Sequence, residues 1–138
     1  MYAVDVDRTQ LDWKLQTDPR VIQIEGNARY MEVDWISEPL KLVTIDVSFI
    51  SLAKILPAVS GIVPEGARCL ALVKPQFEVG KEKVPRGGVV TDPDLHREAV
   101  ASVITAAGRK GFRHRATCPS SITGKEGNRE FFVLLERQ

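Results

Sequence analysis

The sequence has few of the residues and runs that mark several protein classes. Its two cysteines, Cys69 and Cys118, lie far apart and lack a C-x-x-C spacing, so we expect reduced thiols rather than a disulfide. Its two histidines, His96 and His114, have no partner at metal-ligand spacing, so we expect no metal site. No apolar run approaches the length of a membrane span, and the N-terminus does not resemble a signal peptide. We therefore expect a cytoplasmic protein with no membrane partner.

The sequence also lacks an excess of charge of either sign. Its 19 basic and 18 acidic residues give a formal net charge of +1. This balance excludes a basic nucleic-acid-binding tail and an acidic disordered chain, so any nucleic-acid partner must be held by a local patch. The length of 138 residues and the hydrophobic content of 43% indicate one globular domain with a substantial core.

Apolar segments alternate with segments of helical spacing along most of the chain. We expect strands at 2–5, 21–24, 40–45, 69–73, 112–117 and 131–135. Strands that alternate with helices predict an α/β fold with a mostly parallel sheet. The strands are nearly all apolar, as expected where helices cover both faces of a sheet. A Ser/Gly-rich loop joins the last two strands, which favours an antiparallel pair.

The helices have recognisable start signals. We expect helices at 9–15, 51–63 and from Pro93 to Gly108 or Gly111. Asp92 and Pro93 are typical of an N-cap and a first helical position. Pro57 predicts a kink or a short first segment in the helix over 51–63. Residues 75–91 are rich in glycine, proline and charge, and we expect a long loop there.

Charged residues stand at the strand ends where an open α/β sheet binds its ligands. Asp5, Asp46 and Lys74 each follow a strand, and Glu130 opens the last one. An antiparallel last strand would bring Glu130 to the same end of the sheet as Asp5, Asp46 and Lys74. We call this end, where the parallel strands finish, the rim. Alternative interpretations remain for each residue: the aspartates are often helix caps, Lys74 a solvated lysine, and Glu130 a surface partner of a nearby arginine.

Three motifs in the same order resemble the TlyA (hemolysin A) family, which is similar to the FtsJ-type ribosomal RNA 2′-O-methyltransferases. They are Asp46-Val47-Ser48-Phe49-Ile50-Ser51, Leu72-Val73-Lys74-Pro75-Gln76-Phe77-Glu78 and Asn128-Arg129-Glu130-Phe131-Phe132. The resemblance implies a Rossmann-like class I methyltransferase sheet with an antiparallel last strand. It also implies S-adenosylmethionine as cofactor and ribosomal RNA as partner; it fixes no oligomeric state.

The resemblance also implies roles for individual residues. Asp46, Lys74 and Glu130 match three members of a Lys-Asp-Lys-Glu catalytic tetrad. Asp5 would hold the cofactor's ribose hydroxyls, Asn27 would contact its adenine, and Asp46 would also border the cofactor. We expect Lys74 to handle the proton of a ribose 2′-hydroxyl, with Asp46 and Glu130 orienting it.

Two loops beside the rim carry basic residues on a glycine-containing backbone. Lys81, Lys83 and Arg86 lie in one, and Lys125 and Arg129 in the other. Such loops suit contact with RNA phosphates, although ordinary solvated loops have the same composition. Phe49 and Phe77 are candidates for stacking on a nucleobase, but for both we favour core packing.

The sequence departs from the family pattern in two respects: no glycine-rich cofactor turn follows a first strand, and the family's N-terminal RNA-binding S4 domain is missing. That strand normally lies between those ending at Asp5 and Asp46. We therefore expect residues 1–138 to form an incomplete methyltransferase domain, inactive alone, with a strand-sized gap in the sheet or a sheet repacked to close it. The alternative is a non-catalytic α/β module that binds RNA or protein. A pore-forming toxin finds no support, since no amphipathic or spanning segment is present.

Overall fold

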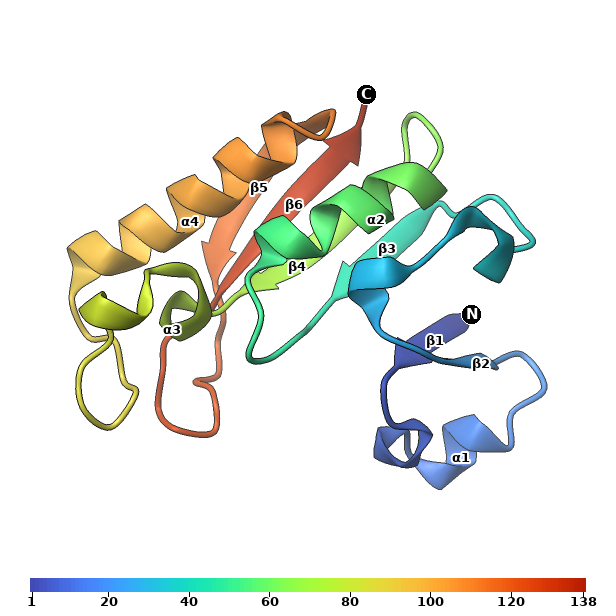
Figure 1. Ribbon diagram of the computed structural model, residues 1–138, viewed down its shortest axis with the longest axis horizontal. Helices are drawn as coiled ribbons and strands as arrows, with labels where there is room; N and C mark the ends of the chain where they lie inside the picture. The colour runs from blue at the N-terminus through green and yellow to red at the C-terminus, as the bar shows by residue number, and fades with distance from the viewer.

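The computed structural model describes residues 1–138 and divides six strands between two sheets (Figure 1). The strands are β1 (Tyr2–Asp5), β2 (Ile22–Glu25), β3 (Leu42–Ile45), β4 (Arg68–Val73), β5 (Phe112–Pro119) and β6 (Phe131–Arg137). β1 and β2 form a parallel pair. The other four form a sheet in the order β3-β4-β6-β5. All six expected strands are therefore present, with small shifts at their ends.

The directions of the strands match the expected α/β sheet. β3 runs parallel to β4, whereas β6 is antiparallel to both β4 and β5. Three strands of the larger sheet thus point one way, and the last strand of the sequence points the other way between two of them. This confirms a mostly parallel arrangement with an antiparallel last strand.

A gap separates β1 from β3, as the sequence predicts. Each of these strands has a partner on one side only, and the β1–β2 pair lies beyond β3 at one end of the molecule (Figure 1). A cavity of about 460 Å³ lies between them, lined mostly by apolar residues that include Val4, Val43 and Ile45. The structure therefore confirms a gap in the sheet rather than a sheet repacked to close it.

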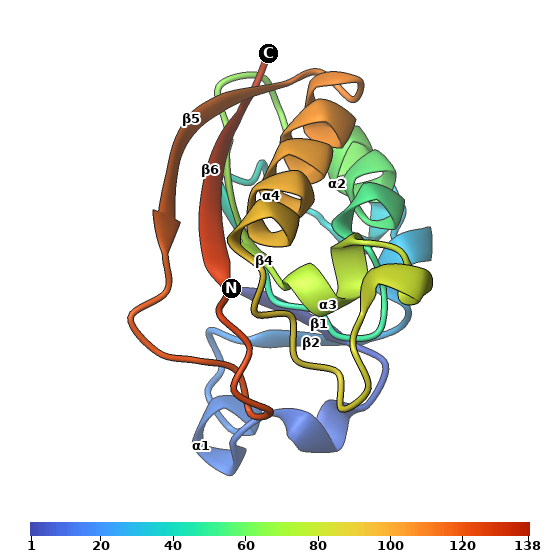
Figure 2. The same cartoon turned by 90° about the vertical axis from the view of Figure 1, so that its left-hand side faces the viewer.

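The main helices all lie on one face of the four-stranded sheet (Figure 2). They are α2 (Leu56–Ile62), α3 (Pro75–Glu78) and α4 (Pro93–Gly108). Leu56, Val103 and Val133 are among the fully buried residues between helices and sheet. Leu70 and Leu134, which pair across β4 and β6 on the opposite face, are only partly buried. The expectation that helices cover both faces is therefore wrong for this sheet.

Capping residues explain where the helices begin. Asp92 accepts a hydrogen bond from the backbone N–H of Asp94, and Pro93 opens α4, as predicted. Pro57 lies in the first turn of α2, and a separate 3₁₀ turn at Leu52–Lys54 precedes it, which is the predicted short first segment. The stretch 75–91 is not wholly a loop, because it contains α3 and a 3₁₀ turn at Lys81–Lys83.

The expected helix at 9–15 is wrong. Two short pieces replace it, a 3₁₀ turn at Arg8–Gln10 and α1 (Trp13–Gln16). Asp7 accepts from the backbone N–H of Thr9 and caps the first piece, and Asp12 caps the second. A second cap so close to the first interrupts the helical hydrogen bonding, because a capping residue takes a non-helical conformation.

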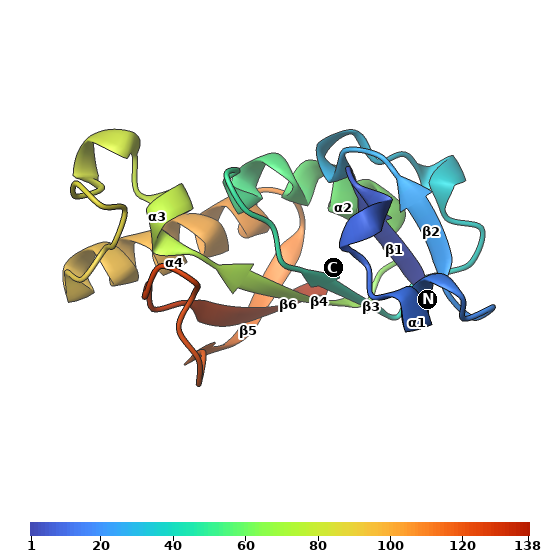
Figure 3. The same cartoon turned by 90° about the horizontal axis from the view of Figure 1, so that it is seen from below.

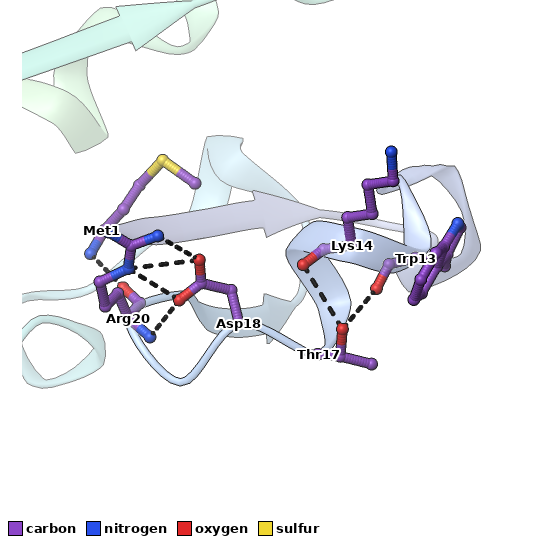
Figure 4. A network of polar contacts seen from close by, with 6 residues as sticks. All are labelled: Met1, Trp13, Lys14, Thr17, Asp18 and Arg20. Atoms are coloured by element: carbon purple, nitrogen blue, oxygen red, sulfur yellow. Dashed lines mark hydrogen bonds and ion pairs between the residues drawn. The ribbon is translucent and has the colours of Figure 1, made fainter.

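Polar contacts close the β1–β2 unit (Figure 4). The N-terminal amine of Met1 donates to the carbonyl of Arg20 over 2.7 Å. The Arg20 guanidinium donates hydrogen bonds to both carboxylate oxygens of Asp18 and holds the pKa of that carboxyl below its ordinary value. Thr17 donates from its hydroxyl to the carbonyl of Trp13. This unit is therefore organised by exposed polar groups rather than by a core.

Candidate functional site

Asp46 and Lys74 are in direct contact at the ends of β3 and β4. The Nζ of Lys74 lies 2.7 Å from Oδ1 of Asp46 and 3.1 Å from the hydroxyl oxygen of Ser48. The Lys74 side chain is 13% exposed, whereas that of Asp46 is 68% exposed. Lys74 is thus not the solvated surface lysine of the alternative interpretation. Its ammonium is held by two acceptors that come from the segment after β3.

Glu130 lies at the same rim but makes no ion pair with Lys74. β4 and β6 pair in a register that ends at Val73 opposite Phe131, so Lys74 and Glu130 are the next residues on the two strands. Glu130 is buried, and its carboxylate faces Gly124, where a Cβ would lie 2.6 Å from Oε1. The head groups of Lys74 and Glu130 are nevertheless not within the 4.0 Å of an ion pair.

Glu130 makes no ion pair with a neighbouring arginine either. The salt bridges of the structure do not include one between Glu130 and Arg129 or Arg137. The alternative interpretation of Glu130 as a surface ion-pair partner is therefore wrong. Its burial leaves a carboxylate at the rim with no basic partner from this chain.

Asp5 and Asn27 lie on the β1–β2 side of the gap and are both exposed. Asp5 accepts a hydrogen bond from the backbone N–H of Asp7, and Asn27 accepts one from the N–H of Arg29 as the cap of a 3₁₀ turn. Asp5 and Asp46 line a single cavity of about 320 Å³ between the two sheets, whereas Asn27 does not line it. The structure thus brings Asp5 and Asp46 to one cavity and leaves Asn27 outside it.

A glutamate that the sequence did not single out joins the segment after β3 to α3. Oε2 of Glu78 accepts from the Ser51 hydroxyl over 2.7 Å, and Oε1 accepts from the Leu52 N–H over 2.8 Å. Burial raises the pKa of Glu78, although both hydrogen bonds oppose that shift. Glu78 lies in the second motif of the resemblance, and this position was the only signal that could have found it.

Phe49 stands out from the rim. Its side chain is 90% exposed and its φ is +63°, a left-handed conformation that costs a bulky residue about 1–2 kcal/mol. Its ring lies 5.2 Å from that of Phe77, centre to centre. Core packing is therefore wrong for Phe49, and the strained backbone holds an aromatic ring in solvent two residues from Ser51.

The two basic loops lie at the α3 end of the molecule, opposite the β1–β2 pair (Figures 1 and 3). The buried amide of Asn128 joins them: its Oδ1 accepts from the N–H of Val90, and its Nδ2 donates to the carbonyl of Gly88. Lys83 is tied to Glu98 of α4 by an ion pair. The remaining four basic residues are exposed and make no ion pair: Lys81, Arg86, Lys125 and Arg129.

No helix in the structure has both the length and the apolar character needed to cross a membrane. No group of three or more histidine, cysteine or acidic side chains is arranged to hold a metal ion.

Comparisons with known proteins confirm the resemblance to the TlyA proteins. The 16S/23S rRNA (cytidine-2′-O)-methyltransferase TlyA of Mycobacterium tuberculosis is 44% identical over 137 residues, which cover 99% of this chain and 51% of the relative. The solved structure of a proposed hemolysin from Streptococcus thermophilus superposes with a TM-score of 0.94 at 42% identity, over 99% of this chain and 50% of that one. The chain spans about half the length of the curated relatives it matches.

A more distant structure supports the fold alone. The N-methyltransferase NodS of Bradyrhizobium japonicum, solved with S-adenosyl-L-homocysteine, matches with a TM-score of 0.63 at 7% identity, over 99% of this chain and 65% of that one. The fold is thus that of the S-adenosylmethionine-dependent methyltransferases. The family model of the FtsJ-like methyltransferases matches residues 1–137, and the chain belongs to that family.

Proposed function

We propose that the chain serves S-adenosylmethionine-dependent methyl transfer to a ribose 2′-hydroxyl of ribosomal RNA. The observation that carries this proposal is the mostly buried Lys74 ammonium, held between Asp46 and Ser48 at the rim of the sheet. The name of the mycobacterial relative, an rRNA (cytidine-2′-O)-methyltransferase, supports the choice of acceptor. With a substrate of this kind, we expect the protein to act in the cytoplasm.

The cavity of about 320 Å³ that Asp5 and Asp46 line suits the ribose of the cofactor. Carboxylates accept hydrogen bonds from vicinal hydroxyls, and Asp5 and Asp46 line that cavity from its two sides. The amide nitrogen of Asn27 remains free to donate to an adenine ring, since only its oxygen is used by the local turn. The bound cofactor would supply an activated methyl group.

The residues at the rim would handle the proton of the acceptor. A ribose hydroxyl is a weak nucleophile at neutral pH, and a positioned base accelerates its attack. Lys74 would first release a proton to solvent and, as the neutral amine, would take up the hydroxyl proton. The Asp46 carboxylate at 2.7 Å would then hold the resulting ammonium in place. Glu130, buried at the same rim without a basic partner, would orient the attacking ribose or a second cation.

The two loops and Phe49 would position the RNA. Lys81, Arg86, Lys125 and Arg129 are exposed, and phosphate contacts of this kind hold an RNA in register. Lys83 instead braces its loop against Glu98, although its charge still adds to the local field. Unstacked bases often pack on exposed aromatic rings, and the ring of Phe49 is available for such a contact.

The test is methyl transfer from radiolabelled cofactor to ribosomal RNA by the protein expressed from its complete reading frame. Lys74→Ala should lower the rate by at least about 100-fold, the usual contribution of a positioned base, while circular dichroism stays unchanged. Lys54→Ala, which removes an exposed lysine of the same domain, is the matched control. A Lys74→Ala protein with wild-type activity would overturn the proposal. Calorimetry with S-adenosylmethionine and residues 1–138 shows whether this chain binds the cofactor weakly or not at all.

A further inference from the structure

The balanced net charge hides a strongly asymmetric distribution. Residues 99–125 contain five basic residues and no aspartate or glutamate, while the rest of the chain carries 14 basic against 18 acidic residues. Four of the five basic residues fall within a stretch of seven. They are Arg109, Lys110, Arg113 and Arg115, which we call the β5 basic edge.

The β5 basic edge lies far from the rim that carries Lys74. β5 is one of the two edge strands of the four-stranded sheet, and it begins after the end of α4. Its last residue, Pro119, pairs with Phe131 beside the rim, whereas its first, Phe112, pairs with Arg137 at the opposite end. The 16-residue α4 spans about 24 Å at 1.5 Å per residue, which sets the distance between the two ends. Figure 1 shows the turn from α4 into β5 at the end of α4 away from α3.

The cations of the β5 basic edge are exposed and nearly unpaired. All four side chains belong to exposed residues, and only Arg115 has an ion pair, with Glu136 at 3.3 Å. Arg137, which pairs with Phe112 of β5, donates to the backbone carbonyls of Lys110 and Gly111. A bulge between His114 and Ala116 lies at Arg115, and bulges change the direction in which a side chain points.

Two ordinary explanations account for part of this charge. Cations near the end of a helix interact favourably with its C-terminal dipole, which suits Arg109 and Lys110. Charged residues on an outer strand also prevent pairing with the edge of another molecule. Neither explanation requires four charges of one sign, three of them without an ion pair, since an acid would protect the strand edge equally well. Crowded exposed cations are the pattern that binds a polyanion.

We propose that the β5 basic edge binds the phosphate backbone of the RNA at a distance from the nucleotide that is modified. The choice of RNA as the polyanion rests on the proposed function. β5 leads from this surface to the loop of Lys125 and Arg129 beside the rim, so one RNA could contact both places. The contacts are to phosphates and carry no sequence preference.

The test compares RNA binding at several salt concentrations by fluorescence anisotropy. The probes are an unstructured RNA oligonucleotide and an RNA duplex of mixed sequence, which distinguish single-stranded from helical backbone. Arg113→Gln with Arg115→Gln should reduce the slope of log affinity against log salt by about 1.5, because each lost phosphate contact removes about 0.7–0.9. Arg113→Lys with Arg115→Lys should restore the slope. The control is Lys14→Gln with Lys54→Gln, two exposed lysines without ion pairs outside this surface.

The outcomes separate this proposal from the proposed function. A Gln double variant whose slope equals that of the wild type on both probes overturns the β5 basic edge, as does a wild-type protein that binds neither probe. Lys74→Ala should lose methyl transfer and keep the wild-type slope. If Lys74→Ala keeps its activity, the proposed function fails, while the slopes still decide the role of the edge. Light scattering on the Gln variant shows whether lost charge has caused association instead.

Discussion

The segment before β3 and the rest of the chain differ sharply in how they are held together. All 22 buried residues lie between Ile45 and Glu130 or in β6, and none lies in residues 1–41. The helices of the first region are three or four residues long, whereas α4 alone has 16 residues. Exposed ion pairs such as Arg8–Glu25 contribute little to stability, so the first region rests on weak contacts.

This difference places the two parts of the candidate site on unequal supports. Asp46, Lys74 and Glu130 belong to the packed region, while Asp5 and Asn27 belong to the region without a core. The arrangement of Asp46, Lys74 and Glu130 should therefore be rigid in this chain, and the positions of Asp5 and Asn27 should be the more mobile ones. Each prediction below tests whether the two regions really differ in this way.

The largest contrast is expected from core truncation. Leu56→Ala removes a fully buried side chain and should lower the free energy of unfolding by about 2–5 kcal/mol. Ile22→Ala removes a side chain of β2 that is 48% exposed and should cost less than about 1 kcal/mol. Denaturant unfolding followed by circular dichroism measures both. Equal losses in the two variants would show that residues 1–41 share the main core.

Most of the packed region could be predicted from its sequence because its signals are local and strong. The Asp92-Pro93 start fixed α4, and Pro57 marked the break between the 3₁₀ turn and α2. The first region was harder, because Leu11 and Leu15 have helical spacing while Asp7 and Asp12 cap two separate pieces. Periodicity reports which face could be buried, but here there is no core to bury it.

The second contrast concerns two helix caps of the same chemistry. Asp92 caps the 16-residue α4, and Asp12 caps the four-residue α1, each through a backbone N–H two residues ahead. Asp92→Ala should lower the free energy of unfolding by about 1 kcal/mol, because the cap supports a helix that packs on the core. Asp12→Ala should leave the main transition unchanged, since α1 contributes nothing to that core. A global loss in the Asp12 variant equal to that of Asp92 would contradict this.

The smallest contrast is one of sign in the pH dependence of stability. Burial raises the pKa of Glu78 above 4.5, so the folded state holds its proton more tightly than the unfolded state. Stability should thus fall as the pH rises through the window just above 4.5, and Glu78→Gln should remove that fall. The Arg20 guanidinium lowers the pKa of Asp18 below 3.8, so its contribution should disappear as the pH falls below that value. Thermal melts across acidic pH, with Asp18→Asn as the counterpart, check both directions.

Sequence reasoning found the rim but not the way it is assembled. The register of β4 with β6 put Lys74 and Glu130 on neighbouring strand ends, yet Glu130 faces Gly124 rather than the ammonium. Glu78 and Asn128 were missed as organising residues, because each acts through two hydrogen bonds between segments distant in the sequence. Such contacts leave no periodic pattern, and only the folded chain reveals them.

The gap between β1 and β3 has a consequence for association. An edge strand usually offers an added strand hydrogen bonds along one side only. Here the unpaired edges of β1 and β3 flank the mostly apolar cavity of about 460 Å³. A strand added there would form backbone hydrogen bonds with both β1 and β3 and would become an interior strand of one continuous sheet. Each hydrogen bond contributes about 0.5–1.5 kcal/mol, so the hydrogen bonds of such a strand would contribute about twice as much as those of a strand added at an ordinary sheet edge. The opening between β1 and β3 is therefore a place where an added strand would gain backbone hydrogen bonds on both of its sides.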